Sequence, residues 1–177
     1  MAHKASILNL EAIIATVRGQ FKEALQLARS SLAYADVLGI GHVSPEWALA
    51  VRAAFELGDI AAVRELLALL DSHQPGHLSP DLRAQRDLAR ARLAGHDGDP
   101  AAGAAFAAAI TSLREHDTPH ELATGLLDQA GYLKHTGHAQ AASAAIAEAR
   151  EIAGRLRCEP LLDRAKAIEH EKPRVRA

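Results

Sequence analysis

The sequence predicts an all-α fold built from about four repeated helix–turn–helix units and one further helix at the C-terminal end. Hydrophobic residues make up 49% of the 177 residues but aromatic residues only 3%, so the apolar content is mostly Ala and Leu, which favour helices. β-branched and aromatic residues, which favour strands, are scarce. Phrases marked by glycine and proline also recur at a nearly constant interval, as they do in repeat proteins.

The repeat is carried first by four glycines, which we call the turn glycines: Gly19, Gly58, Gly98 and Gly137. Their spacings are 39, 40 and 39 residues. Each opens a similar phrase, namely GQFKEAL, GDIAAVREL, GDPAAGAAF and GHAQAASAAI. Because glycine readily adopts the left-handed conformation that ends a helix, each should close one helix shortly before the next begins.

Five residues after each turn glycine lies a small or modest side chain. These are Ala24, Val63, Gly103 and Ala142. A side chain of this size allows the two helices of a unit to approach closely, so we predict a packing role for these positions.

Prolines follow the turn glycines by 21 to 26 residues, at Pro45, Pro80, Pro119 and Pro160. The first three follow Ser or Thr, whose hydroxyl can cap a helix that begins at the proline. We therefore expect a single repeat domain over residues 1–170 and a polar tail over 171–177. Its helices should lie near 5–18 and 21–38, 45–57 and 60–72, 80–94 and 100–115, and 119–136 and 139–156, with a capping helix at 160–170.

The charge and cysteine content exclude several classes of protein. The formal net charge of −2 argues against a nucleic-acid-binding surface, which would be basic. Cys158 is the single cysteine, so an intramolecular disulfide is excluded and a reducing compartment is favoured. The longest apolar run, residues 101–110, is too short to span a membrane. We therefore expect a cytoplasmic protein. Because the sequence begins inside a helical pattern, we also expect this chain to be a piece of a longer protein.

The phrase formed by Gly19, Phe21 and Ala24 resembles the turn of tetratricopeptide repeats, and Gly137 with Ala142 keeps the same spacing. The unit here is longer than the usual one of about 34 residues. Most aromatic positions of that family hold Ala or Leu in this chain. The resemblance implies an α-solenoid with an inner groove that binds a partner.

Residues 90–164 resemble the C-terminal helical repeats of large bacterial signalling proteins, which include nucleotide cyclases and ATPase-type transcription regulators. This resemblance implies a scaffold or regulatory region at the end of a multidomain protein. The cyclase and ATPase motifs themselves are absent from the sequence, so those activities are not implied for this chain.

Three features of the sequence partly match catalytic or cofactor sites. Gly98 and Gly103 have the glycine spacing of a phosphate-binding loop, but Ala follows where Lys and Ser/Thr are needed. The histidine pairs straddle Pro or Gly breaks, so none has the spacing of a metal site on one helix. Cys158 has Arg157 beside it but no base paired with it by any sequence signature. The sequence therefore predicts neither an enzyme nor a bound cofactor or metal.

An arginine stripe is the strongest candidate for a binding surface. Arg83, Arg86 and Arg90 fall within about 60° of arc on a helix, and Arg52 of the preceding unit extends the stripe. Such a stripe suits carboxylates or phosphates in an inner groove. The alternative is a solvated face in which Asp87 pairs with Arg83 and Arg90. Large aromatics dominate core energetics, so Trp47 and Phe55 are expected to pack in the core.

These observations favour an interaction module. Its partner is expected to be a protein segment, a neighbouring domain of the same polypeptide or a second copy of the chain, with no nucleic acid or membrane involved. The alternative is a sensor that closes its groove around a small effector molecule.

Overall fold

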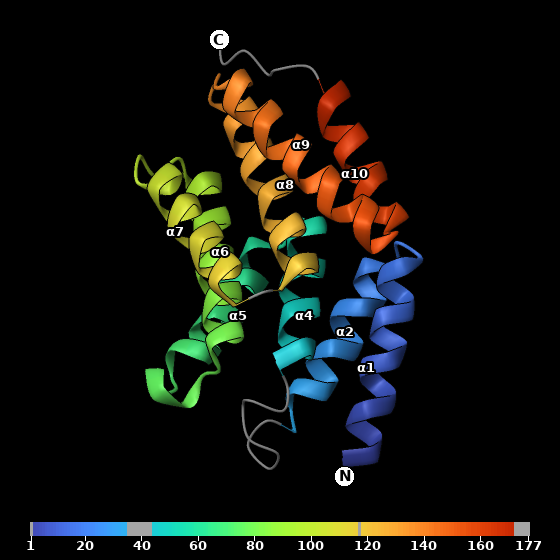
Figure 1. Cartoon of the computed structure of the whole chain (residues 1–177). Helices are drawn as coiled ribbons and strands as arrows, with labels where there is room; N and C mark the ends of the chain where they lie inside the picture. The colour runs from blue at the N-terminus through green and yellow to red at the C-terminus, as the bar shows by residue number, and fades with distance from the viewer. Residues whose placement is uncertain (1, 35–43, 117, 172–177) are drawn as a thin grey trace. The chain divides into compact units, whose positions relative to one another are not determined.

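Every regular element in the part of the chain that the structure describes is a helix (Figure 1). The structure is a computed structural model and describes residues 2–34, 44–116 and 118–171. The all-α prediction is confirmed for these ranges. The elements are α1 (Ala2–Val17), α2 (Phe21–Leu32), α4 (Ser44–Glu56), α5 (Ile60–Asp71), the short 3-10 helix η2 (Pro75–His77), α6 (Pro80–Asp97), α7 (Ala102–Glu115), α8 (Pro119–His135), α9 (Ala139–Leu156) and α10 (Glu159–His170).

The observed helices begin and end within three residues of the predicted positions, apart from the end of α2. The helix predicted over 21–38 ends at Leu32, and residues 35–43 lie outside the described ranges. The chain divides into two compact units, residues 1–89 and 90–177, which we call the first and the second unit.

In the first unit, α2 packs on α1 and α4, α1 also contacts α4, and α5 packs on α4. Trp47 of α4 is 1% exposed, and its indole N–H donates a hydrogen bond to the Leu66 carbonyl of α5 at 2.7 Å. This confirms the expected core position of Trp47. The buried Ser31 hydroxyl of α2 donates to the Glu46 carboxylate of α4 at 3.4 Å, so polar contacts join α2 and α5 to α4.

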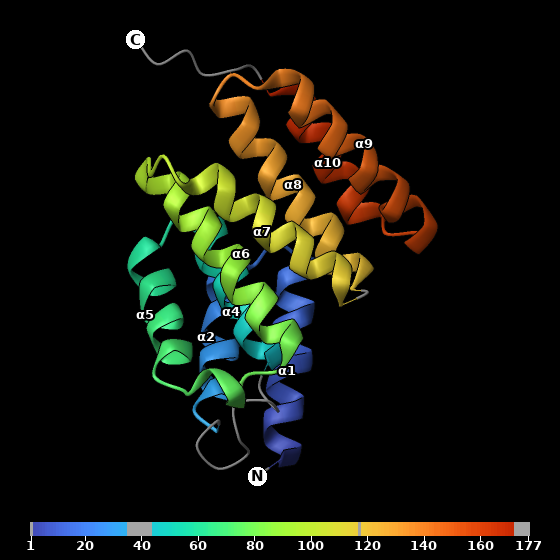
Figure 2. The same cartoon turned by 60° about the vertical axis from the view of Figure 1, so that its left-hand side comes forward.

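In the second unit, α8 contacts α7, α9 and α10, and α9 also contacts α10 (Figure 2). The aromatic rings of Phe106 and Tyr132 pack with their centroids 5.3 Å apart and link α7 to α8. The core between these helices is aliphatic, with Leu113, Leu126, Leu127, Ile146, Ile152 and Leu161 all buried.

The turn glycines adopt the predicted conformation. Their φ angles lie between 67° and 84°, in the left-handed region that favours glycine. Arg157 reaches the same region at the end of α9, with φ of 52°, although it is not glycine and no sequence signal marked it.

The predicted helix starts differ in how they are capped. The Ser79 side-chain oxygen accepts a hydrogen bond from the Leu82 N–H at 3.2 Å, as a capping residue should. Thr118 makes no capping bond to α8, so that part of the prediction is wrong. Its hydroxyl donates instead to the Leu113 carbonyl near the end of α7, at 3.4 Å.

The small side chains after the turn glycines lie in the core in three of the four phrases. Ala24, Val63 and Ala142 are at most 1% exposed, whereas Gly103 is half-buried and its neighbour Ala102 is fully buried. The buried position after Gly98 differs from that in the other three phrases because α7 begins four residues after its turn glycine. The helices α2, α5 and α9 begin two residues after theirs. The Asp99 side chain accepts the Ala101 N–H at 2.8 Å within this longer turn.

Candidate functional site

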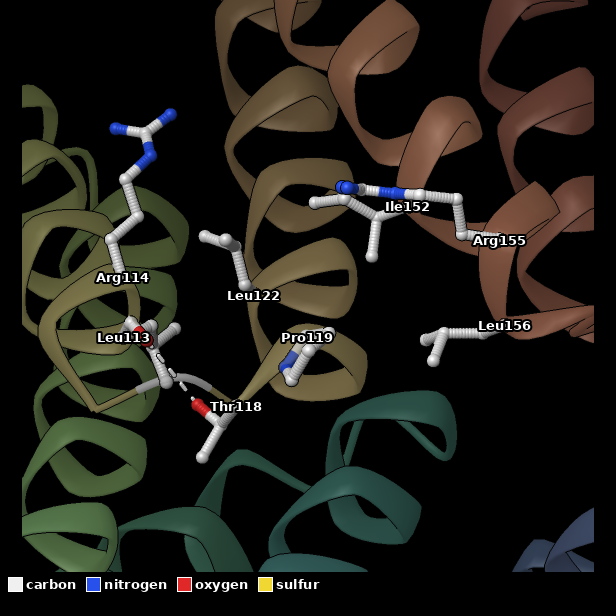
Figure 3. Close-up of a pocket in the computed structure, with 8 residues that line it drawn as sticks. All are labelled: Leu113, Arg114, Thr118, Pro119, Leu122, Ile152, Arg155 and Leu156. Atoms are coloured by element: carbon white, nitrogen blue, oxygen red, sulfur yellow. Dashed lines mark hydrogen bonds between the residues drawn. The ribbon is translucent and has the colours of Figure 1, made fainter.

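A pocket of about 360 Å³ lies in the second unit where the end of α7, the start of α8 and the end of α9 meet (Figure 3). It is lined by Leu113, Arg114, Thr118, Pro119, Leu122, Ile152, Arg155 and Leu156. The lining thus combines aliphatic side chains with two arginines and includes no carboxylate.

The apolar part of the pocket is continuous with the core of the second unit. Leu113 and Ile152 are buried, Leu122 is half-buried, and Leu156 is 43% exposed at the rim. Leu113 lies on α7, Leu122 on α8, and Ile152 and Leu156 on α9, and both α7 and α9 pack on α8. An aliphatic group entering here would therefore contact side chains that the fold already holds in position.

The two arginines of the pocket differ in whether a carboxylate pairs with them. Arg114 donates to both carboxylate oxygens of Glu148 at 2.7 Å, and its guanidinium points away from the apolar side chains (Figure 3). Arg155 makes no hydrogen bond or ion pair with any residue that the structure describes, and its side chain extends past Ile152 toward Leu122. Arg155 is therefore the cation available to a ligand in this pocket.

The start of α8 adds a second positive contribution. Amide groups in the first turn of a helix carry partial positive charge, and Thr118 and Pro119 place this end of α8 at the pocket. Glu121 lies in the same turn without lining the pocket. A hydrogen bond with His120 lowers the pKa of the Glu121 carboxyl, against the opposing effect of its partial burial.

The predicted arginine stripe is largely occupied by contacts within the protein. In the first unit, the Arg83 guanidinium donates to the Leu78 carbonyl at 3.0 Å. The Arg86 side chain is only 14% exposed and pairs with Asp87 at 3.2 Å and with Asp71 at 3.9 Å. Asp87 thus pairs with Arg86, whereas the solvated-face alternative predicted pairs of Asp87 with Arg83 and Arg90.

The other two residues of the predicted stripe lie on different elements of the two units. Arg52 is half-buried on α4, and Arg90 is exposed on α6 at the first position of the second unit. Arg90 has interaction partners of its own. The binding role of the stripe stays a prediction, and we take the pocket beside Arg155 as the candidate site.

A buried ion-pair cluster in the second unit was not anticipated from the sequence. The Asp128 side chain on α8 is 2% exposed and lies between Arg92 of α6, at 3.3 Å, and Arg164 of α10, which donates to its other oxygen. The three residues follow each other at intervals of 36, which is the one signal that could have revealed them. Because all three side chains are largely buried and paired, the cluster joins helices rather than presenting a charge to a ligand.

Other features carry no site in the described ranges. No group of three or more His, Cys, Asp or Glu residues there could hold a metal ion. Cys158 is half-buried at the start of α10. The segment before Gly98 is the helix α6, not the strand that a phosphate-binding loop requires. Across these same ranges, none of the helices combines the length and apolar content needed to cross a membrane.

Comparison of the chain with models of known protein families, with curated proteins and with solved structures gave no match.

Proposed function

We propose that this chain is a helical-repeat interaction module, and that its pocket binds a protein segment carrying an aliphatic side chain next to a carboxylate. The observation that supports this most directly is the pairing of an aliphatic pocket wall with the unpaired cation of Arg155. Apolar contact would supply affinity, and the arginine would select the charge.

The wider setting is proposed from the sequence. The likeness of residues 90–164 to C-terminal repeats of bacterial signalling proteins supports a scaffold or regulatory role within a larger cytoplasmic protein. In this role the chain acts by shape and charge complementarity, without making or breaking bonds. The period of 39 or 40 residues between turn glycines supports the tetratricopeptide-like description of the array.

Selection of displayed random peptides on the intact chain tests the proposed partner. Enriched peptides should carry Leu, Ile, Met or Phe within two or three positions of Asp or Glu. Arg155→Gln should weaken their binding by about fivefold to tenfold, the range for a hydrogen bond to a charged group at a partly exposed position. Arg18→Gln is the matched control, because it removes the same charge from an exposed residue just after α1.

Two results would contradict the proposed site. One is a failure to enrich any peptide motif. The other is equal binding of enriched peptides to the Arg155→Gln and wild-type chains, which would place the binding surface elsewhere.

A small aliphatic carboxylate is the second candidate ligand, because the pocket volume of about 360 Å³ lies within the range of small-molecule sites. Differential scanning fluorimetry against nucleotides, sugars, amino acids and hexanoate would detect such an effector. Hexanoate should raise the melting temperature of the wild-type chain and of Arg18→Gln, but not that of Arg155→Gln. Hexanol, which lacks the carboxylate, should have a smaller effect, and the absence of any shift would remove this alternative.

A further inference from the structure

The outward face of α1 is apolar over most of its length. Ile7, Leu10, Ile13, Ile14 and Val17 are between 41% and 75% exposed. With 3.6 residues per turn, these five side chains fall within about 120° of arc on the helix surface. They form one continuous stripe, which we call the α1 stripe.

The opposite face of α1 is the one that packs in the first unit. Ala12 and Ala15 are at most 3% exposed, and α1 contacts α2 and α4. Eight of the eleven residues from 7 to 17 are apolar, so this helix is hydrophobic on both sides. A helix with apolar residues all round is normally buried on all sides, whereas here one side is covered and the other is exposed.

The last helix of the chain shows the contrasting arrangement. Leu161 and Ala165 of α10 are buried, while Asp163, Lys166 and Glu169 on its outer surface are exposed. A polar outer face of this kind is what a helix at the end of a stack needs in water. The α1 stripe lacks it, which indicates that this surface has a binding partner.

The spacing within the α1 stripe indicates what kind of partner fits. Ile7, Leu10, Ile14 and Val17 follow each other at intervals of three, four and three residues. This is the a/d spacing of a two-stranded helical seam, with Ile7 and Ile14 at a and Leu10 and Val17 at d. Ile at a with Leu at d, the pairing of Ile7 and Leu10, favours two strands over three or four. A second α1 presents the same spacing and the same side chains, so the stripe is complementary to itself.

We propose that the α1 stripe is a self-association surface, on which α1 of a second copy of this chain packs to form a two-fold dimer. In such an isologous interface each copy contributes the same patch. This proposal concerns the first unit alone and does not depend on the ligand of the pocket in the second unit.

The area of the α1 stripe is sufficient for a modest dimer. A large aliphatic side chain presents about 100 Å² of apolar surface, so the five exposed fractions amount to roughly 300 Å² in each copy. Two copies would bury about 600 Å² of apolar surface, and at an apolar fraction near 60% the whole interface would reach about 1,000 Å². This is the lower end of the range for specific interfaces, so a dissociation constant in the micromolar range is expected.

Sedimentation equilibrium of the full chain between about 1 and about 500 µM tests the proposal. The wild-type chain should pass from monomer to dimer across this range. Leu10→Glu should raise the dimer dissociation constant about a hundredfold or more, since both copies lose an apolar contact and gain a buried charge. Leu57→Glu is the matched control, because Leu57 is also a large apolar residue, 44% exposed, but lies after α4 and outside the stripe.

A second variant separates loss of association from loss of folding. Val17 is 75% exposed at the last position of α1, so Val17→Glu should weaken the dimer without changing the helical circular dichroism signal. A wild-type chain that remains monomeric at every concentration would overturn the proposal. A dimer that Leu10→Glu and Val17→Glu leave as tight as the Leu57→Glu control would do so as well, because another surface would then hold it.

Discussion

Arg92 of α6 and Asp128 of α8 form an ion pair at 3.3 Å inside the second unit, and Arg164 of α10 completes it from the other side. The buried Asp128 carboxylate therefore pairs with two arginines from two different helices. Loss of that charge would break the buried ion pairs that join α6 and α10 to α8.

Asp128→Asn should lower the free energy of unfolding by about 3 kcal/mol, because it breaks the ion pairs of a buried carboxylate with two helices. Chemical denaturation followed by circular dichroism measures this. Asp163→Asn is the control, since Asp163 pairs with Lys166 at an exposed position and should change stability by less than about 0.5 kcal/mol. Equal effects of the two variants would mean that the buried cluster contributes no more than a surface pair.

Gly58→Ala should destabilise the first unit by about 1 kcal/mol, although the space around Gly58 is open. An added Cβ would meet no atom within 4 Å, so the cost arises only from the φ angle of 67°. Gly154→Ala is the opposite case, because Gly154 lies within α9 with open space and no positive φ angle. It should raise stability by about 0.5 to 1 kcal/mol, and thermal melts of the two variants should move in opposite directions.

Gly95 and Gly103 both face Tyr132 but at different distances. A Cβ at Gly95 would lie 3.0 Å from Tyr132 Cδ2, whereas a Cβ at Gly103 would lie 3.7 Å from the Tyr132 hydroxyl oxygen. Gly103→Ala should therefore keep the helix-favouring gain of about 0.5 kcal/mol. Gly95→Ala should be less stable than Gly103→Ala by about 1 kcal/mol, since the tyrosine ring must shift. The reverse order in urea denaturation would contradict this packing.

Glu121 should make part of the stability of the second unit depend on pH. Because its hydrogen bond with His120 lowers the pKa of the folded-state carboxyl, its contribution is present above the usual glutamate pKa and is lost as pH falls through the lowered value. Urea denaturation of wild type and Glu121→Gln should show a stability difference at pH 6 that shrinks below about pH 4.3. The difference should be small, since the His120 and Glu121 side chains are 48% and 38% exposed. A difference that is constant from pH 6 to pH 3 would exclude this contribution.

The helices and turns could be predicted from the sequence because their signals are local. A left-handed glycine such as Gly137, or a proline such as Pro119 at a helix start, acts through the backbone of its own few residues. The capping role of Thr118 failed for a non-local reason, since its hydroxyl bonds to the Leu113 carbonyl of the preceding helix. The prediction that Gly103 packs between helices assumed a turn as short as the other three. The turn around Asp99 is longer, so Ala102 is the buried residue instead.

The candidate site could not be predicted in the same way. Three arginines on one helix face are visible as a pattern, but whether Arg86 is available depends on Asp71, which lies on a different helix. No sequence pattern marks Arg155, because the other side chains of the pocket come largely from α7 and α8 and meet Arg155 only in the fold. Local patterns therefore located the elements, and tertiary contacts decided which charges are available to a ligand.

The four left-handed glycine turns also determine how tolerance to mutation should be distributed along the chain. Each turn requires a positive φ angle at one residue, whereas the alanine-rich helix contacts between turns can accept many small substitutions. A saturation-mutagenesis profile should therefore show sharp minima of tolerance at Gly19, Gly58, Gly98 and Gly137, separated by 39 or 40 positions. Related chains that have diverged at most other positions would then remain recognisable by the interval between their glycines.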